Sequence, residues 1–473
     1  MAYHTPFHTV VIGAGSGGLT VAVGLAKFGK QVALVERGPI GGDCTNVGCV
    51  PSKTLIHSVE HPFDDADAVL QHVRDKRNHL RDEETEWVHT VENVSVFHGS
   101  AKLTGETKVE VSLEDGNTQT LEAKNIVLAT GGRPRRLDVD GLPDGRTLTN
   151  ETLFEQPHKP EHLAIIGAGP IGLEMAFAFR KLGSRVSLIN RGGRVYSVGD
   201  PEVSEVIEKS LKEKCVEVYL NAQASRYDED EKTLFLNQNG QEVALSSVDR
   251  VLMAAGRTPN VTGLGLENTG LHYDEKKGVP AGPFGATNVE SLFAIGDVNP
   301  ASNFTHSANA QGRRVVRRLA LPWLPTFGKE PPYPSATFSD PEIAMVGPSL
   351  EDLHERYHPD LIKTLHVELK DTDRGYTQGL EDGFVRIHAV RLTGRILSAT
   401  IVAPKASEMI SMLTLAVYEG ISLYKLAGVV FPYPTLSEGI KKAADAFTFE
   451  TLPKLPQELM TYARTRFASP KRR

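Results

Sequence analysis

Two segments of the chain share one order of apolar and polar positions. Residues 9–37 and residues 162–191 each begin with an apolar run, pass through a glycine-rich turn and a helical pattern, and end in a run rich in β-branched residues. This order is typical of a βαβ unit. Because the copies start about 150 residues apart, they indicate a duplicated domain rather than a short repeat.

The pattern between these units predicts one long helix and several strands. The segment Val69–Glu92 is rich in charged residues at helical spacing, so we expect a helix there. Short strands are predicted at Val94–Phe97, at Val109–Leu113 and at Asn125–Gly131.

A proline-rich stretch at Leu321–Pro334 predicts a linker, after which the pattern changes. Strand patterns then precede helical ones, which is typical of an α+β domain. The predicted strands are Ala336–Phe338, Phe384–His388 and Ser398–Val402, and the predicted helices are Met409–Glu419 and Leu436–Phe447.

The composition is that of an ordinary globular protein. The chain has 473 residues, of which 40% are hydrophobic and 23% charged, and its net charge is −7. This length is enough for two to four domains of roughly 100–200 residues each. The acidic balance gives no reason to expect binding to nucleic acid or to an anionic membrane surface. We find no apolar run of about 18 residues and no secretory signal, so we expect a cytoplasmic protein without a membrane span.

The first glycine motif predicts a dinucleotide site. Gly13, Gly15 and Gly18 form G-x-G-x-x-G between a strand pattern and a helical pattern. Glycines permit a tight turn there and let a pyrophosphate approach the helix N-terminus, where free N–H groups favour negative charge. Glu36 ends the second strand, where an acid can bind the hydroxyl groups of a ribose.

The second glycine motif predicts another dinucleotide, of a different kind. Its glycines are Gly167, Gly169 and Gly172. The following strand ends at Asn190 without an acid, and Arg191 and Arg194 come next. Because an arginine suits a 2′-phosphate, we expect NADPH rather than NADH, although both arginines could be ordinary solvated loop residues. Two dinucleotide sites in one chain suggest hydride transfer between a nicotinamide and a flavin.

Two of the three cysteines lie close together. Cys44 and Cys49 have the spacing C-x4-C, and no second pair accompanies them, so a zinc site is not expected. The run after Cys44 has the character of a helix start, where a thiol has a lowered pKa and is a better nucleophile. These residues therefore predict a redox-active disulfide, while Cys215 is expected to be inert.

Together the motifs resemble those of the glutathione reductase, lipoamide dehydrogenase and mercuric reductase family of flavoproteins. The matching pieces are GAGSGG, GGDCTNVGCVPSK, ATGGRP, GAGPIGLE, AAGRTPN, FAIGDV and FPYPTLSEGI, in the family's order. The resemblance implies an α/β protein with two doubly wound Rossmann-like domains and a C-terminal α+β dimerisation domain. It places a discontinuous FAD-binding domain at 1–150 and 280–325, an NAD(P)H-binding domain at 151–279 and the dimerisation domain at 330–473.

The resemblance also implies roles for single residues. Cys49 would face the flavin, and Cys44 would meet the acceptor. Lys53 would lie near the flavin and pair with Glu174. The remaining residues that the resemblance assigns to cofactor binding are Thr130, Gly131, Arg257 and Asp297. The active site would be shared between the two subunits of a homodimer.

One motif departs from the disulfide-reducing members of the family. Where those carry H-x-H-P-T-x-S-E, this chain has Phe431 and Tyr433 in place of the histidines and keeps Glu438. A histidine can protonate a leaving thiolate at neutral pH, whereas a tyrosine with a pKa near about 10 does so poorly. The stretch resembles the F-P-Y-x-T-x-x-E-G pattern of mercuric reductases, in which thiolates bind a soft metal ion.

The sequence therefore predicts a mercuric-reductase-like enzyme. NADPH would reduce FAD, FAD would reduce the Cys44–Cys49 disulfide, and a thiol-bound metal ion such as Hg(II) would accept the electrons. The sequence lacks the vicinal cysteine pair typical of mercuric reductases, so mercury would arrive on a small thiol carrier. The main alternative is an enzyme acting on a small disulfide or dithiol, and a further one is a diaphorase that does not use the cysteines.

Overall fold

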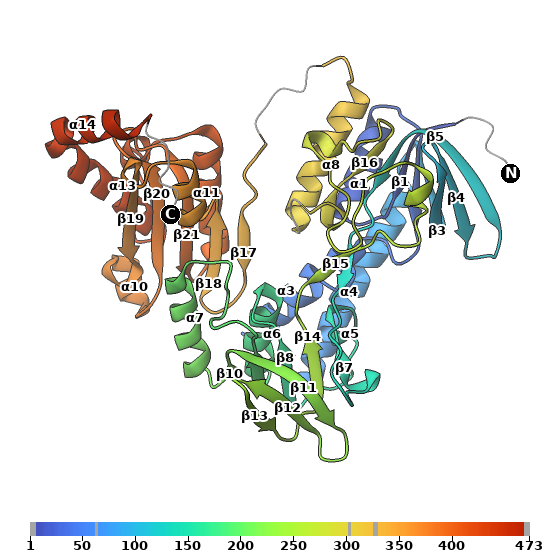
Figure 1. The fold of residues 1–473 in the computed structure, drawn as a ribbon, viewed down its shortest axis with the longest axis horizontal. Coiled ribbons are helices and arrows are strands. Elements are labelled where there is room, and N and C mark those ends of the chain that lie inside the picture. The colour runs from blue at the N-terminus through green and yellow to red at the C-terminus, as the bar shows by residue number, and fades with distance from the viewer. Residues whose placement is uncertain (1–5, 62–64, 301–303, 325–329, 468–473) are drawn as a thin grey trace. The chain divides into compact units, whose positions relative to one another are not determined.

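The computed structural model describes residues 6–61, 65–300, 304–324 and 330–467 (Figure 1). The chain groups into two compact units, which are described separately. The first takes in the described parts of Met1–Gly167, Lys181–Val186 and Gln223–Glu330. The second takes in Ala168–Arg180, Ser187–Ala222 and the described parts of Pro331–Arg473.

The first unit contains a parallel sheet in the order β3-β2-β1-β5-β16. The strands are β1 (Phe7–Ile12), β2 (Val32–Glu36), β3 (Val94–Gly105), β5 (Thr118–Leu128) and β16 (Leu292–Ala294). The last strand comes from far along the chain, so the sheet is discontinuous in sequence, as expected for the flavin-binding fold.

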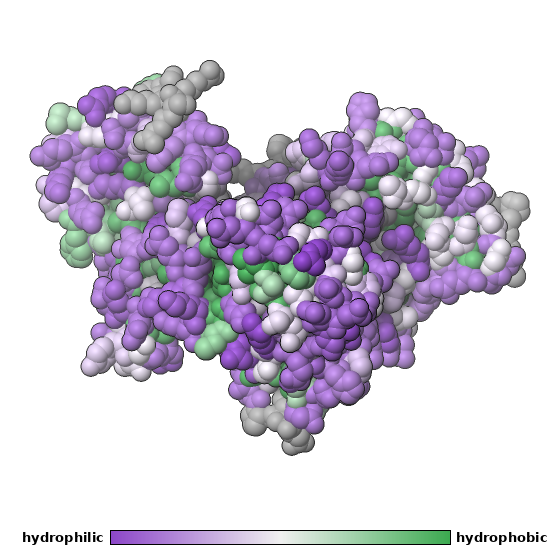
Figure 2. All heavy atoms as spheres, turned by 60° about the horizontal axis from the view of Figure 1, so that its bottom comes forward, coloured by the Kyte–Doolittle hydropathy of each residue, from purple (hydrophilic) through white to green (hydrophobic). Residues whose placement is uncertain are grey.

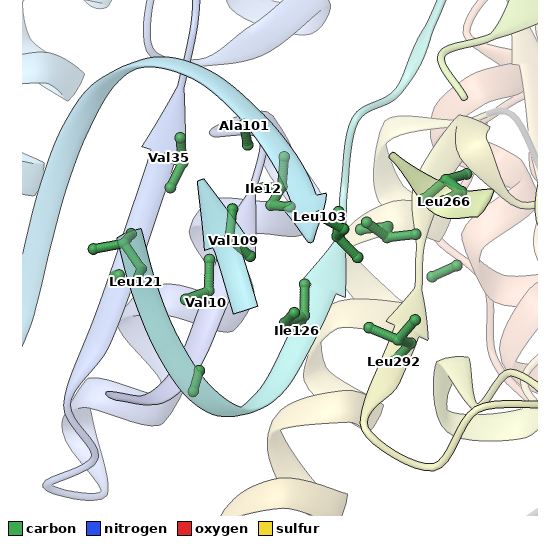
Figure 3. Close-up of a cluster of buried hydrophobic side chains, with 14 of the residues drawn as sticks. Val10, Ile12, Val35, Ala101, Leu103, Val109, Leu121, Ile126, Leu266 and Leu292 are labelled. Carbon is green, nitrogen blue, oxygen red and sulfur yellow. The ribbon is translucent and has the colours of Figure 1, made fainter. Parts of the chain in front are cut away.

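Both faces of this sheet are covered. Along β1, Val11 packs under the helices α1 (Ser16–Lys27) and α8 (Thr305–Ala320), whereas Val10 and Ile12 face a second apolar cluster. This alternation is what a strand with a period of two produces. Figure 3 shows the second cluster, in which β4 (Lys108–Leu113) and its neighbouring strands curl over Val10 and Ile12.

The predicted long helix is present as α4 (Ala66–His89). Its N-cap is Asp65, whose side chain accepts a hydrogen bond from the Ala68 backbone N–H at 2.7 Å. The remaining elements of the first unit are short helices and strands. They are α2 (Gly42–Asn46), α3 (Cys49–Ser58), α5 (Asn150–Leu153), β6 (Gly132–Pro134), β7 (Thr147–Leu148), β8 (His162–Ile166), β11 (Ala222–Asp228), β12 (Thr233–Gln238), β13 (Gln241–Leu245), β14 (Arg250–Met253) and β15 (Arg257–Pro259).

The second βαβ unit follows the predicted order along the chain. The strand β8 is buried throughout and pairs in parallel with β14, which in turn pairs with β7. The elements after β8 are α6 (Pro170–Lys181), β9 (Arg185–Ile189), α7 (Pro201–Glu213) and β10 (Glu217–Tyr219). Within the second compact unit of the fold, β10 pairs in parallel with the end of β9.

The second unit also contains an antiparallel sheet in the order β17-β18-β21-β20-β19. The predicted strands and helices of the third domain are confirmed with shifted ends, whereas β18, β19, α9, α10, α12 and α14 were not predicted. The elements are β17 (Ser335–Thr337), β18 (Glu342–Val346), α9 (Leu350–Arg356), β19 (Ile362–Glu368), α10 (Asp373–Gln378), β20 (Phe384–Val390), β21 (Ile396–Ala403), α11 (Ala406–Glu419), α12 (Leu423–Ala427), α13 (Glu438–Thr451) and α14 (Leu455–Thr465).

An apolar core holds this sheet against α11 and α13. Ile387 and Ile401 of the sheet are fully buried with Leu413 of α11 and Phe447 of α13.

The surface in Figure 2 is mostly hydrophilic, with apolar side chains in small groups. Among the described residues no helix combines the length and the apolar character needed to cross a membrane. The described parts of the predicted linker, 321–324 and 330–334, contain neither helix nor strand.

Candidate functional site

The first glycine turn has the geometry of a phosphate cradle. Gly13 has a φ of +104°, and a Cβ added there would lie 2.3 Å from the carbonyl oxygen of Ala129. A Cβ on Gly18 would lie 1.8 Å from the carbonyl oxygen of Gly13. The N-cap of α1 is Gly15, so no side chain covers the first N–H groups of the helix. The turn therefore fits a dinucleotide pyrophosphate, which those N–H groups would bind.

The carboxylate of Glu36 lies at the end of β2, as predicted, beside this turn. Its Oε2 accepts a hydrogen bond from the Ala14 backbone N–H at 2.6 Å, and its Oε1 accepts one from Gly38 at 2.8 Å. The side chain thus helps to shape the turn, in addition to the ribose-binding role predicted for it. Thr130 and Gly131 follow β5, and the Thr130 hydroxyl donates to the carbonyl oxygen of Asn260 at 2.8 Å.

Arg257 joins three of the sequence motifs. Its Nε donates to Oδ2 of Asp297 at 2.9 Å, and its Nη2 donates to the carbonyl oxygen of Gly132 at 2.6 Å. The same Nη2 also forms an ion pair with Asp43, the residue before Cys44. Burial opposes the charge of Arg257, but the two carboxylates outweigh it and raise the guanidinium pKa. Burial raises the pKa of Asp297, and the attraction of Arg257 offsets part of that rise.

The first glycine of the second turn has the same conformation as Gly13. Gly167 has a φ of +116°, and a Cβ there would lie 2.4 Å from the carbonyl oxygen of Ala254. Gly169 and Gly172 lie at and just inside the start of α6. Arg191 is exposed, and the backbone carbonyl of Arg194 accepts a hydrogen bond from the Asn190 side chain at 2.8 Å. The preference for NADPH stays a prediction.

The two cysteines lie at the start of consecutive helices. Cys44 is the third residue of the short α2, and Cys49 is the first residue of α3. Both thiols are partly buried, and the Cys49 sulfur lies 3.4 Å from the Thr305 hydroxyl oxygen. A hydrogen bond with Cys49 and burial raise the pKa of Cys44. The expected lowering of the Cys44 pKa is therefore wrong, because the hydrogen bond with the neighbouring sulfur and burial both favour the protonated thiol.

A pocket of 590 Å³ opens beside Cys44 within the first unit. Its walls come from α1, α4 and α8 and include Glu84, Trp87, Asn309 and Arg313. Glu84 accepts a hydrogen bond from the Thr45 hydroxyl at 2.9 Å, so its carboxylate is held next to the cysteine helix. The pocket gives a small molecule access to Cys44.

Lys53 and Glu174 are placed in different units. Lys53 is partly buried in α3, close in sequence to Cys49. Glu174 is buried in α6, where its Oε1 accepts a hydrogen bond from the Phe338 backbone N–H at 3.0 Å. The implied ion pair between Lys53 and Glu174 stays a prediction.

Tyr433 is an exposed side chain with a defined partner. It is 72% exposed, and its hydroxyl donates to Oδ2 of Asp373 at 2.8 Å. That hydrogen bond and the charge of Asp373 raise the pKa of Tyr433. Glu438 begins α13 and lies 3.5 Å from Lys442, while its Oε2 is buried without a hydrogen-bond partner among the described residues. Asp373, rather than Glu438, therefore orients the tyrosine hydroxyl.

Sequence reasoning missed three residues that contact or neighbour the predicted site residues. Thr305 contacts Cys49, Glu84 lines the pocket at Cys44, and Asp373 accepts the hydrogen bond of Tyr433. The neighbouring His306 is exposed and stacks on Phe304 with ring centroids 5.4 Å apart. Asp373 lies in the run from Lys370 onward, which resembles the corresponding stretch of mercuric reductases.

Most of the chain matches the models of one known protein family. The model described as pyridine nucleotide-disulphide oxidoreductase matches residues 7–312, and the model of its dimerisation domain matches residues 333–444. These matches cover both glycine motifs, both cysteines and the segment with Tyr433.

Individual relatives divide between two activities. A mercuric reductase of Streptomyces lividans is 33% identical over 466 residues, which cover 94% of this chain and 97% of the relative. A mitochondrial dihydrolipoyl dehydrogenase of Dictyostelium discoideum is 31% identical over 467 residues, which cover 93% and 94%. A solved structure, the Cu(II) complex of the HOCl-induced flavoprotein disulfide reductase RclA from Escherichia coli, has a TM-score of 0.84 at 25% identity, covering 93% of this chain and 99% of that one.

Proposed function

Because the chain belongs to the pyridine nucleotide-disulphide oxidoreductase family, we propose that it passes electrons from NADPH to a thiol-bound metal ion such as Hg(II). The electrons would travel through FAD and the Cys44–Cys49 pair. The observation that carries the choice of acceptor is the Tyr433 hydroxyl, whose proton is already donated to Asp373. A match to the family's dimerisation domain indicates a homodimer.

The cofactor-holding residues are those of the first glycine turn and its neighbours. The N–H groups at the start of α1 would bind the pyrophosphate, and Asp297 would bind the ribityl chain. Redox chemistry between the nicotinamide and the disulfide is supplied by FAD when it is bound. Lys53 would lie near the flavin ring, where a cation stabilises negative charge on a buried group.

The cysteines would accept two electrons and then bind the ion. Reduction breaks the bond between Cys44 and Cys49 and leaves two sulfurs that can replace the carrier thiols on Hg(II), which depart as free thiols. The two bonds from mercury to Cys44 and Cys49 then break, mercury leaves as the element, and the disulfide forms again. The position of Cys49 at the first residue of α3 favours negative charge on its sulfur.

Tyr433 suits a metal ion better than a leaving thiolate. Its hydrogen-bonded proton and raised pKa make it a poor general acid at neutral pH. The lone pairs of its oxygen are not used by Asp373, so they can contact an electron-poor ion held by the cysteines of the partner subunit. The mercuric reductase relative and the Cu(II) complex of RclA support a metal ion as acceptor.

The pocket beside Cys44 supports delivery on a small carrier. Its 590 Å³ is large enough for a low-molecular-weight thiol complex, and Cys44 itself lies in the wall. No further cysteine of the sequence is near in the chain to Cys44 and Cys49, so the carrier thiols would stay on the ion until it reaches the pocket.

A direct test is NADPH oxidation by the purified holoenzyme under anaerobic conditions. Hg(II) on a small thiol, glutathione disulfide and lipoamide would be offered in parallel. We expect fast turnover with Hg(II) only. Fast turnover with a disulfide and none with Hg(II) would contradict the proposal.

The role of Tyr433 has its own variant and control. Tyr433→Phe removes the hydroxyl, and we expect it to lower the Hg(II)-dependent rate about tenfold, which corresponds to the loss of one good polar contact. Tyr376→Phe is the matched control, because Tyr376 is an exposed tyrosine of the same unit in α10. Since the pKa of Tyr433 is raised above about 10, the rate should show no step from this residue between about pH 6 and 9.

A second candidate is the oxidation or reduction of a small dithiol or disulfide. The dihydrolipoyl dehydrogenase relatives favour it, as does Glu438, which this chain keeps with one buried oxygen that has no hydrogen-bond partner among the described residues. Lipoamide turnover that depends on Glu438 would support this reading.

A further inference from the structure

Asp43 forms an ion pair although its side chain is well exposed to solvent. It lies in α2, directly before Cys44, and its side chain is 45% exposed. An acid at such a position could remain solvated, yet its Oδ2 is paired with Nη2 of Arg257 from β15. The guanidinium is the more buried partner, with its side chain 18% exposed.

The pairing decides how Arg257 uses its donors. Nε goes to Oδ2 of Asp297, while Nη2 is shared between Asp43 and the carbonyl oxygen of Gly132. Asp297 is thus held through one oxygen only, and among the described residues its Oδ1 accepts no hydrogen bond. An arginine and a carboxylate left to themselves prefer two parallel hydrogen bonds, which would occupy both oxygens.

We propose that Asp43 is a positioning residue. By pairing with Nη2 of Arg257, it prevents bidentate hydrogen bonding between Arg257 and Asp297 and so keeps one Asp297 oxygen available to FAD. The proposal rests on the role proposed above for Asp297 in holding the ribityl chain. It adds that the residue directly before Cys44 helps to hold the flavin.

The charges around Arg257 favour this arrangement, in which Nε pairs with Asp297 and Nη2 pairs with Asp43. One guanidinium lies between two carboxylates, so the cluster has a formal excess of one negative charge. With Asp43 neutral, Arg257 would be attracted by Asp297 alone, and the shortest route to full pairing is rotation of Nη2 toward Oδ1. FAD would then compete with Arg257 for that oxygen.

The test is the rate at which FAD leaves the intact holoenzyme. Flavin fluorescence rises on release, so the rate is measured after dilution without any acceptor or nicotinamide. We expect Asp43→Asn to speed release about tenfold, the effect of one charge-assisted hydrogen bond. Asp43→Glu, which keeps the charge, should restore most of the retention. Asp144→Asn is the control, because Asp144 pairs with Arg136 in the same unit but is 94% exposed.

Further variants separate the possible failures. If Asp43 acts through Arg257, adding Asp43→Asn to Arg257→Lys should change release by less than about twofold. If Asp297→Asn speeds release but Asp43→Asn does not, the role of Asp43 is overturned while that of Asp297 stands. If neither changes release, both are overturned. Should Asp43→Asn fail to accumulate, Asp43→Ser removes the same charge and is measured in its place. None of these results depends on whether Hg(II) is the acceptor.

Discussion

The two glycine-rich βαβ segments begin their turns with a glycine in the same conformation but differ in the side chain at the end of the second strand. Gly13 and Gly167 have φ values of +104° and +116°, and an added Cβ would lie 2.3 Å and 2.4 Å from a carbonyl oxygen. The first βαβ segment then has Glu36 where the second βαβ segment has Asn190. The first glycine therefore helps to fix the turn, and the residue at the end of the second strand is predicted to select the nucleotide.

The side chains at these two positions have opposite hydrogen-bonding roles, because Glu36 accepts from the backbone and Asn190 donates to it. Glu36 accepts from the backbone N–H groups of Ala14 and Gly38. The Asn190 amide donates to the carbonyl oxygens of Gly192 and Arg194, at 3.3 Å and 2.8 Å. A carboxylate beside one turn can bind ribose hydroxyls, whereas the other loop presents no acid there and leaves Arg191 exposed.

The largest expected effect comes from filling the turns. Gly13→Ala and Gly167→Ala should each lower the free energy of unfolding by about 2–4 kcal/mol, because each adds left-handed strain and a clash. Gly13→Ala should also lose FAD, whereas Gly167→Ala should keep FAD and bind NADPH weakly. Thermal unfolding and flavin absorbance measure both. Gly145→Ala, where an added Cβ contacts nothing within 4 Å, is the control. If Gly13→Ala kept its flavin, the two turns would not serve separate nucleotides.

A smaller effect should follow from the charge of the second loop. Arg191→Ala should raise the KM for NADPH about tenfold and leave that for NADH unchanged, because only NADPH carries the 2′-phosphate. Steady-state kinetics with both nucleotides measure the ratio. Lys212→Ala, an exposed cation on α7 in the same unit, is the control. An equal loss with both nucleotides would instead assign Arg191 to a part that they share.

The smallest effect should come from Glu36→Gln. The amide keeps one acceptor oxygen but turns an NH2 group toward a backbone N–H, so we expect a loss of about 1–2 kcal/mol in the free energy of unfolding. Urea denaturation of the holoenzyme measures it, with Glu110→Gln on β4 as the control. An unchanged midpoint would show that the two backbone hydrogen bonds of Glu36 contribute little.

Local motifs made much of this protein predictable. The strand-turn-helix order at both glycine motifs is confirmed, and the long helix is present with its ends shifted by three residues, because each depends on residues near one another in the chain. The redox role of the cysteine pair stays a prediction. The domain class followed from the order of these motifs.

Contacts between distant segments were not predictable. Thr305 reaches Cys49 across more than 250 positions, and Asp373 reaches Tyr433 across 60. The pKa of Cys44 was expected to fall because a helix start was considered alone, while the neighbouring sulfur and burial act in the opposite direction. Periodicity and spacing contain no information on such partners.

The strand β16 has a consequence for synthesis on the ribosome. It pairs with β5 at the edge of the flavin sheet, although more than 150 residues separate the two strands in the chain. At ordinary translation rates, β5 has emerged roughly 10–30 s before its neighbour exists. During that interval its free edge is a template for pairing with another chain, so the nascent protein should need protection there from aggregation.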